Sequence, residues 1–254
     1  MIIILILLLF IICLFYYNKE YFTNNTYLNK TELYEFLISN SDNYYNTFNN
    51  YDFKVRNITC IEDYNLKIKN VVTEINFINK IYINMLINKI NKKFKEINII
   101  GLDGEKASLI PWNIGFINGR DYEYGLPHTR NNIIIIPLHL LNEHNLLNEH
   151  TLLERVLFHE KVHIYQKLYS EDIEKYLINK GFKQYLHRNN FNNIRANPDI
   201  NEWSYTDSNN NLLIAQYIDN PNTIHDVIYY PINKDNYEHP YEFMAYELED
   251  IFFK

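Results

Sequence analysis

Residues 151–168, TLLERVLFHEKVHIYQKL, decide which fold we expect. Thr151 and Glu154 have the spacing of a capping box, so the sequence predicts a helix that begins at Leu152. Hydrophobic residues surround the centre of the stretch, which is typical of a helix half buried in a domain: Leu153, Val156, Leu157, Phe158 and Val162.

Two histidines and a glutamate lie in the middle of this helix. His159 and His163 are one turn apart, within roughly 40° around the axis, so both imidazoles can direct Nε2 at one metal ion. Glu160 is rotated by roughly 100° from His159 and can instead reach a water at that metal. Such a His-Glu-x-x-His string is typical of zinc sites in which the Glu is the general base. The alternative is a surface helix with two solvated histidines and a Glu–Lys pair.

The overall composition limits the other classes of function. The chain has 254 residues, enough for one sizeable domain or two small ones. A formal charge of −7 and a pI of 5.7 argue against nucleic-acid binding. Cys13 and Cys60 are the only cysteines, which excludes a disulfide framework and a Cys-rich zinc site. The abundance of Asn, Ile, Tyr and Lys fits an AT-rich genome, such as that of a large DNA virus or an AT-rich microbe.

The string supplies only two ligands, whereas a catalytic zinc normally has three protein ligands and a water. A metzincin would have Gly and His where this chain has Gln166 and Tyr169, which excludes that class. The remaining route is a carboxylate on a later helix.

At this point the chain resembles the gluzincins, HExxH metallopeptidases in which a later Glu completes the zinc site. The resemblance rests on HEKVH at residues 159–163 and on EHPYEFMAYE at residues 238–247, where a Pro-x-Glu-x-x-Ala pattern lies at a helix start. It covers these two segments only. It implies that His159, His163 and Glu242 bind Zn²⁺.

Two departures limit this resemblance. The segments lie further apart than in the thermolysin pattern, and Tyr246 stands where that pattern has an Asp that orients a His. A solvated acidic helix face is the alternative for Glu242, and three rival ligands stay open: Glu238, His239 and Glu247.

The resemblance implies zinc-dependent hydrolysis of a peptide or protein substrate. The metal would activate a water, and Glu160 would take its proton and pass it to the leaving amine. Five residues are open as the donor that stabilises the oxyanion: Tyr205, His225, Tyr241, Tyr246 and Arg195. Two other classes of function also stay open. One is a membrane-anchored protein with an inactive or structural zinc site, and the other is a viral membrane or structural protein in which HExxH is incidental.

The N-terminus predicts a single-pass membrane anchor. Residues 1–17, MIIILILLLFIICLFYY, contain no charged side chain and reach the short end of the length that spans a bilayer. A cleaved signal peptide and a buried core helix are the alternatives. The side of the membrane stays open, because following lysines favour the cytoplasm whereas three sequons suit a lumenal domain: Asn24, Asn29 and Asn57.

Upstream of the signature helix we expect a tether at residues 18–50, with a short helix from Thr31, and then a domain at residues 51–254. Residues 53–60 alternate like a strand. An apolar stripe from residue 66 to 94, which includes Ile78 and Met85, predicts one long helix or two broken ones packed on the core.

Short strands are expected at residues 97–100 and 132–137, with residues 111–128 irregular because of their Pro and Gly content. The isoleucine run at 132–137 is either the edge along which an extended substrate pairs or a buried core strand. Residues 127–129 precede this strand and are a weak candidate for the border of a cleft.

After the signature helix, the sequence predicts helices at residues 170–181 and 240–253 and strands at residues 212–217 and 226–230. Residues 189–211 are polar and are expected to form a surface excursion. In the excursion, residues 197–199 with Trp203 and Tyr205 form either a cleft wall or a turn. The expected fold is therefore α+β and zincin-like, with a small sheet packed on the HExxH helix and a helical C-terminal lobe that supplies Glu242.

Overall fold

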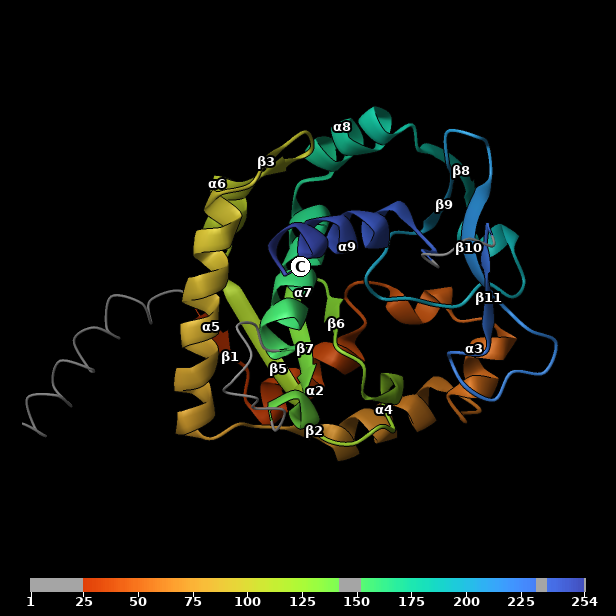
Figure 1. Ribbon diagram of the computed structural model, residues 1–254. Helices are drawn as coiled ribbons and strands as arrows, with labels where there is room; N and C mark the ends of the chain where they lie inside the picture. Colours follow the sequence, from red (N-terminus) through yellow and green to blue (C-terminus); the bar gives the residue numbers. More distant parts are fainter. Residues whose placement is uncertain (1–24, 142–151, 232–236, 254) are drawn as a thin grey trace, which may run out of the picture.

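The structure is a computed structural model that describes residues 25–141, 152–231 and 237–253. It is an α+β fold in which helices α7 (Leu152–Leu168) and α9 (Pro240–Phe252) lie between two sheets (Figure 1).

The first sheet has the strand order β1-β5-β7-β6, and β2 pairs with β5 off this path. Strands β1, β5 and β7 are parallel, whereas β6 is antiparallel to β7. Strand β7 therefore lies inside the sheet, which confirms the buried core strand at residues 132–137 and excludes the alternative of a substrate-pairing edge. The strand bounds are β1 Asn25–Tyr27, β2 Val72–Thr73, β5 Trp112–Ile117, β6 His128–Arg130 and β7 Ile133–Pro137.

Helices cover both faces of this sheet, which explains the run of four isoleucines in β7. Ile134 and Ile136 pack into the core formed with α5 (Phe77–Lys95) and α7. Their neighbours along the strand point the other way, into the core formed with α2 (Lys30–Ser39) and α4 (Ile61–Val71). A strand buried on both faces is apolar at every position rather than at alternate ones.

The second sheet is antiparallel, in the order β11-β10-β9-β8, and follows α8 (Ser170–Lys180). Its strands are β8 Lys183–His187, β9 Trp203–Thr206, β10 Leu212–Tyr217 and β11 Val227–Tyr230. The smaller elements are α3 Asn50–Val55, β3 Asn98–Ile99, β4 Leu102–Asp103 and α6 Gly104–Leu109. The predicted α8, β10, β11 and α9 are confirmed to within one or two residues, and β9 adds a strand inside the predicted excursion.

Residues 53–60 do not form the predicted strand. They span the end of α3, a short turn and the N-cap of α4. The Asn49 side chain accepts hydrogen bonds from the backbone N–H groups of Tyr51 and Asp52, and Asp52 accepts one in return from the Asn49 N–H. This capping box starts a helix where the alternation of residues had suggested a strand.

The prediction that residues 111–128 are irregular is also wrong for β5, which lies inside the first sheet. Gly115 is a member of this strand rather than a break in it. A Cβ atom there would lie 2.5 Å from Leu33 Cδ1, so the glycine permits close approach of α2. In α2, the short helix expected within the tether, Leu33 and Leu37 are fully buried.

The apolar stripe between residues 66 and 94 is divided between α4 and α5, with β2 between them. Its prediction as core is wrong for two side chains on α5. Ile78 is 75% exposed and Met85 is 64% exposed. The face of α5 that carries them points away from the domain.

Three predictions fall outside the described residues: the anchor at residues 1–17, the sequon at Asn24 and the Thr151 cap. Within the described ranges, no helix combines the length and apolar character needed to cross a bilayer.

Candidate metal centre

Helix α7 presents His159 and His163 on the side that faces α9. Both imidazoles are buried, and their Nε2 atoms lie 3.1 Å apart. Residues one turn apart on a helix lie on the same face, so the helix itself sets this approach.

The N-terminal turn of α9 brings in the third residue. His239 caps the helix by accepting a hydrogen bond from the Tyr241 N–H, and Pro240 occupies the first turn, where a missing N–H costs nothing. Glu242 follows within this turn. Ala245, one turn further on, is fully buried, and its small side chain lets α9 pack closely against α7.

The three side chains enclose one point. Glu242 Oε2 lies 3.4 Å from His159 Nε2 and 3.7 Å from His163 Nε2. Ligands at about 2.0–2.2 Å from a tetrahedral zinc are separated from one another by about 3.4 Å. The triangle of ligand atoms therefore has the size that a zinc ion requires. In the described part of the chain it is the only such group of three His, Cys, Asp or Glu residues.

Neighbouring side chains fix the orientation of each imidazole. His159 Nδ1 lies 3.2 Å from Glu249 Oε2, and Glu249 is held in turn by Arg155. His163 Nδ1 lies 2.8 Å from Gln166 Oε1. An acceptor on Nδ1 places the ring proton there and leaves Nε2 free to bind a metal.

Asn197 orients the third residue. Its side-chain amide donates to Glu242 Oε1 at 3.0 Å and to Glu238 Oε1 at 2.8 Å. The first of these bonds holds one oxygen of Glu242 and leaves Oε2 directed at the imidazoles.

The sequence reasoning missed these three orienting roles, although a signal existed for two of them. Glu249 lies two helical turns after Glu242, and Gln166 lies three residues after His163, so each shares a helix face with a predicted ligand. Asn197 has no comparable signal, because it reaches the site from a segment without regular structure. Its role supports the cleft-wall alternative for residues 197–199.

Glu160 is buried beside the three residues, with 3% of its surface exposed, and its Oε2 has no hydrogen-bond partner in the described residues. Burial, reinforced by the negative charge of Asp199, raises the pKa of Glu160 well above its usual range. The raised pKa makes the side chain a stronger base once it is ionised, and its position lets it exchange a proton with a water in the adjoining cavity.

The charges of the cluster are unbalanced. Burial alone would lower the pKa of His159, but hydrogen bonds to Glu242 and Glu249 raise it to about 10. Burial would raise the pKa of Glu242, yet the two imidazoles hold it well below its usual range. Without another cation, the site therefore holds a proton on His159, and a divalent cation at the same point would replace that proton.

A cavity of about 510 Å³ opens beside this cluster. Its wall includes His159, Glu160 and Glu242 together with Asn197 and Asp199. Residues 127 and 128 border it as well, as the sequence had suggested. This volume lies within the range of about 300–1,000 Å³ that is usual for ligand pockets.

The three rival ligands have other partners. Glu238 bonds Arg195 and Asn197, and Glu247 bonds Tyr176 and Lys180. His239 caps α9, and its Nε2 lies 3.2 Å from Asn201 Oδ1.

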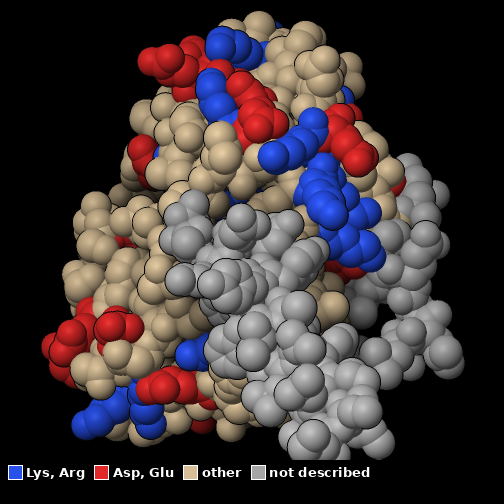
Figure 2. Space-filling view, turned by 90° about the vertical axis from the view of Figure 1, so that its left-hand side faces the viewer, with Lys and Arg blue, Asp and Glu red and all other residues tan. Residues whose placement is uncertain are grey.

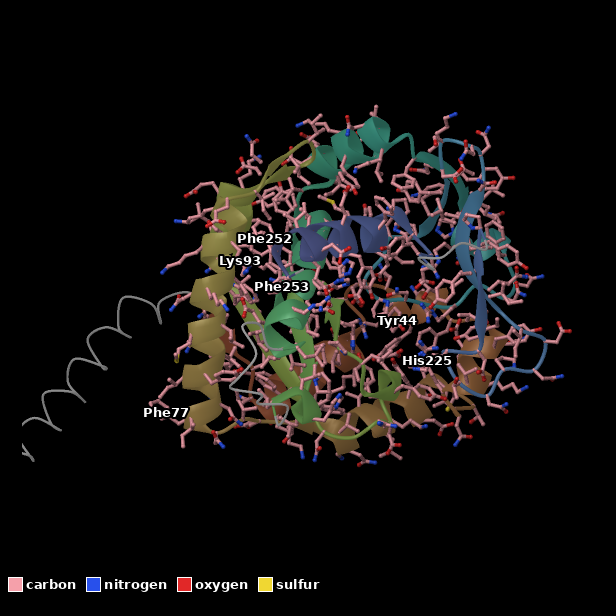
Figure 3. The ribbon with its side chains drawn as sticks, in the orientation of Figure 1. Tyr44, Phe77, Lys93, His225, Phe252 and Phe253 are labelled. Atoms are coloured by element: carbon pink, nitrogen blue, oxygen red, sulfur yellow. The ribbon has the colours of Figure 1, made fainter. Side chains whose placement is uncertain are left out.

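The five candidate donors to the oxyanion differ in their hydrogen-bond partners and in their positions. Tyr205 and Tyr241 are bonded to Asn201, and Arg195 is paired with Glu238. His225 packs on the Tyr124 ring, away from α7 (Figure 3). Arg195 and Tyr246 both border the cavity. Only Tyr246 has its ring against His159, at 4.6 Å between centroids, and its hydroxyl makes no hydrogen bond in the described part of the chain.

Strand β6 forms the edge of the first sheet next to this site, and its outward backbone groups are already bonded. The Thr129 N–H donates to Asp199 Oδ1, and the Thr129 carbonyl accepts from Lys167 Nζ at 2.9 Å.

Comparisons with protein-family models, with curated proteins and with solved structures found no match to this chain.

Proposed function

We propose that this chain is a zinc-dependent peptidase of the zincin type. The observation that carries the proposal is the convergence of His159, His163 and Glu242 on one point, beside the buried and unpartnered carboxylate of Glu160. A purely structural zinc would need a fourth protein ligand, and the described residues offer only three.

Each residue of the site would have a separate role in hydrolysis. Zinc bound by the three ligands would polarise a water and the scissile carbonyl. Glu160 accepts the proton of the attacking water and returns it to the leaving amine. The Tyr246 hydroxyl is the donor that we favour for the developing oxyanion, because it alone of the five candidates faces the cavity without another partner.

The arrangement of the elements supports the zincin comparison. Helix α7 packs on the first sheet, and the acid comes from a helix near the end of the described chain. We further propose that the substrate is a peptide or protein, and that residues 1–17 anchor the enzyme in a membrane.

Zinc content and activity of four full-length proteins test the proposal. The wild type should contain one zinc per chain and cleave a random decapeptide library, with the products read by mass spectrometry. His163→Ala should lose both properties. Glu160→Gln should keep zinc and lose activity by roughly 10²–10⁴-fold, because only the proton acceptor is removed.

Glu171→Gln, at an exposed position on α8, is the matched control and should behave as the wild type. A wild-type protein without zinc would overturn the metal site. A Glu160→Gln protein as active as the wild type would overturn the peptidase mechanism while leaving the metal site in place.

A further inference from the structure

Helix α5 has one face that the domain does not use. Residues 77, 81, 85, 88, 92 and 95 follow one another at helical spacing and lie opposite the buried side chains Ile83, Leu86, Ile87, Ile90 and Phe94. The outward face is apolar in its first half, where Phe77 is 60% and Met85 64% exposed. Phe77 points away from the molecule in Figure 3.

The second half of the helix is basic. Helix α5 contains five lysines and no acidic residue, although the whole chain has a formal charge of −7. Lys92 and Lys95 continue the outward face beyond Met85, and both are exposed. Figure 2 looks onto this side of the molecule, where a run of lysine and arginine side chains lies on the right. Exposed apolar side chains next to lysines are typical of helices that lie on an anionic lipid surface.

The chain enters the described fold at this same helix. The Asn25 side chain donates to Asn84 Oδ1 at 2.7 Å, and the Tyr27 hydroxyl donates to the same atom at 2.9 Å. Strand β1 is thus fastened to α5 at its first residue. Residues 18–24 connect it to the apolar run, and seven residues span at most about 25 Å.

We infer that the outward face of α5 docks on an anionic membrane surface, with Phe77, Ile78 and Met85 in the interfacial layer and Lys92 and Lys95 against the headgroups. The inference extends the proposed anchorage by residues 1–17 and is independent of the metal centre. An inserted N-terminal run would hold α5 within reach of the bilayer. Docking of α5 would then fix how the domain sits on the surface.

Spin labels on the full-length protein test this docking. In a Cys13→Ser/Cys60→Ser background, Met85→Cys or Ile78→Cys carries the label, and Ile178→Cys on α8, 70% exposed, is the control. The proteins are reconstituted in vesicles of phosphatidylcholine with or without phosphatidylserine. Labels at positions 78 and 85 should become accessible to oxygen and protected from a water-soluble relaxation agent in the anionic vesicles, whereas the label at 178 should stay in water.

Charge reversal tests the role of the lysines. Lys92→Glu with Lys95→Glu should lower the ratio of docked to undocked protein by about 25-fold or more, since each basic side chain near an anionic surface contributes roughly fivefold. Lys69→Glu with Lys183→Glu, two exposed lysines on other elements, makes the same change in net charge and should leave docking unchanged.

Flotation of the vesicles distinguishes failure of the anchorage from failure of the docking. Protein that does not float overturns both the anchorage and the docking. Protein that floats with labels 78 and 85 in water overturns the docking alone. Labels shielded from water before vesicles are added would assign the face to a second copy or to residues 1–17, and would equally overturn it.

Discussion

Two buried charged clusters in this chain differ in how their charges are balanced. In the first, Arg56 donates two hydrogen bonds to Glu123, at 2.9 and 2.8 Å, and one to Asp52 at 2.9 Å. All three residues are buried, and the positive charge belongs permanently to the protein. In the second, His159, His163, Glu242 and Glu160 come together without any such cation.

The difference indicates that the two clusters have different roles in the protein. Breaking a buried ion pair is costly, so a fully paired cluster such as that of Arg56 holds elements together. Here it joins α3 and residue 123 to the second sheet, because Asp52 also accepts a hydrogen bond from Tyr217. In the second cluster, Glu160 Oε2 has no hydrogen-bond partner in the described residues, and the positive charge is only a proton that His159 can release to a metal ion. We therefore expect substitutions in the Arg56 cluster to lower stability and substitutions in the His159 cluster to remove metal binding.

Arg56→Met should cause the largest loss of stability, about 3–5 kcal/mol in the free energy of unfolding, because it leaves two buried carboxylates without a cation. Urea denaturation followed by circular dichroism measures the change. The folded fraction should still bind zinc. An unchanged urea midpoint would mean that the two clusters do not differ in this way.

Zinc should stabilise the wild type by about 2.7 kcal/mol when the free ion is at a hundred times its dissociation constant. Thermal unfolding with zinc and with a chelator measures this effect. The same increment should appear in Arg56→Met and vanish in His163→Ala. An increment that survives in His163→Ala would place the zinc somewhere else.

Glu249→Gln should weaken zinc binding by about 10–100-fold, because it replaces the carboxylate that orients His159 with a weaker acceptor. Competition with a chromophoric chelator gives the affinity. Glu247→Gln, on the same helix but bonded to Tyr176 and Lys180, is the matched control and should keep the wild-type value. Equal losses in the two variants would count against an orienting role for Glu249.

The smallest expected effect is a loss of stability at acidic pH. Burial would raise the pKa of Glu123, but the charge of Arg56 lowers it below the ordinary value of 4.5. The folded state therefore binds this proton less readily than the unfolded state. The resulting stability is complete above about pH 4.5 and is lost as the pH falls through the lower folded value. Urea midpoints between pH 6 and pH 3 should fall less steeply for Glu123→Gln than for the wild type, and parallel slopes would exclude this contribution.

The sequence predicted those parts of the fold in which local signals and tertiary packing agree. Helix α7 runs over the predicted range 152–168, because its apolar residues and its periodicity indicate the same structure. The helix expected from residue 240 brings Glu242 to the two histidines as the resemblance implied. In these elements, the spacing of residues close in the sequence was enough to predict the structure.

Where packing decides the structure, the predictions failed. Gly115 looked like a loop residue, but its missing side chain accommodates α2 against the first sheet. The alternation over residues 53–60 could not reveal that Asn49 starts a helix just before it. Ile78 and Met85 matched a core stripe, because periodicity shows which residues share a face and not what that face contacts.

The bonded backbone of Thr129 has a consequence for how substrates are chosen. An extended peptide that joins a free sheet edge is held through its main chain, whatever its side chains are. Here Asp199 and Lys167 are bonded to the Thr129 backbone at that edge, so in the proposed peptidase a substrate would be held mainly through its side chains in the cavity. For the proposed peptidase we therefore expect selective processing of few targets rather than general degradation of unfolded protein.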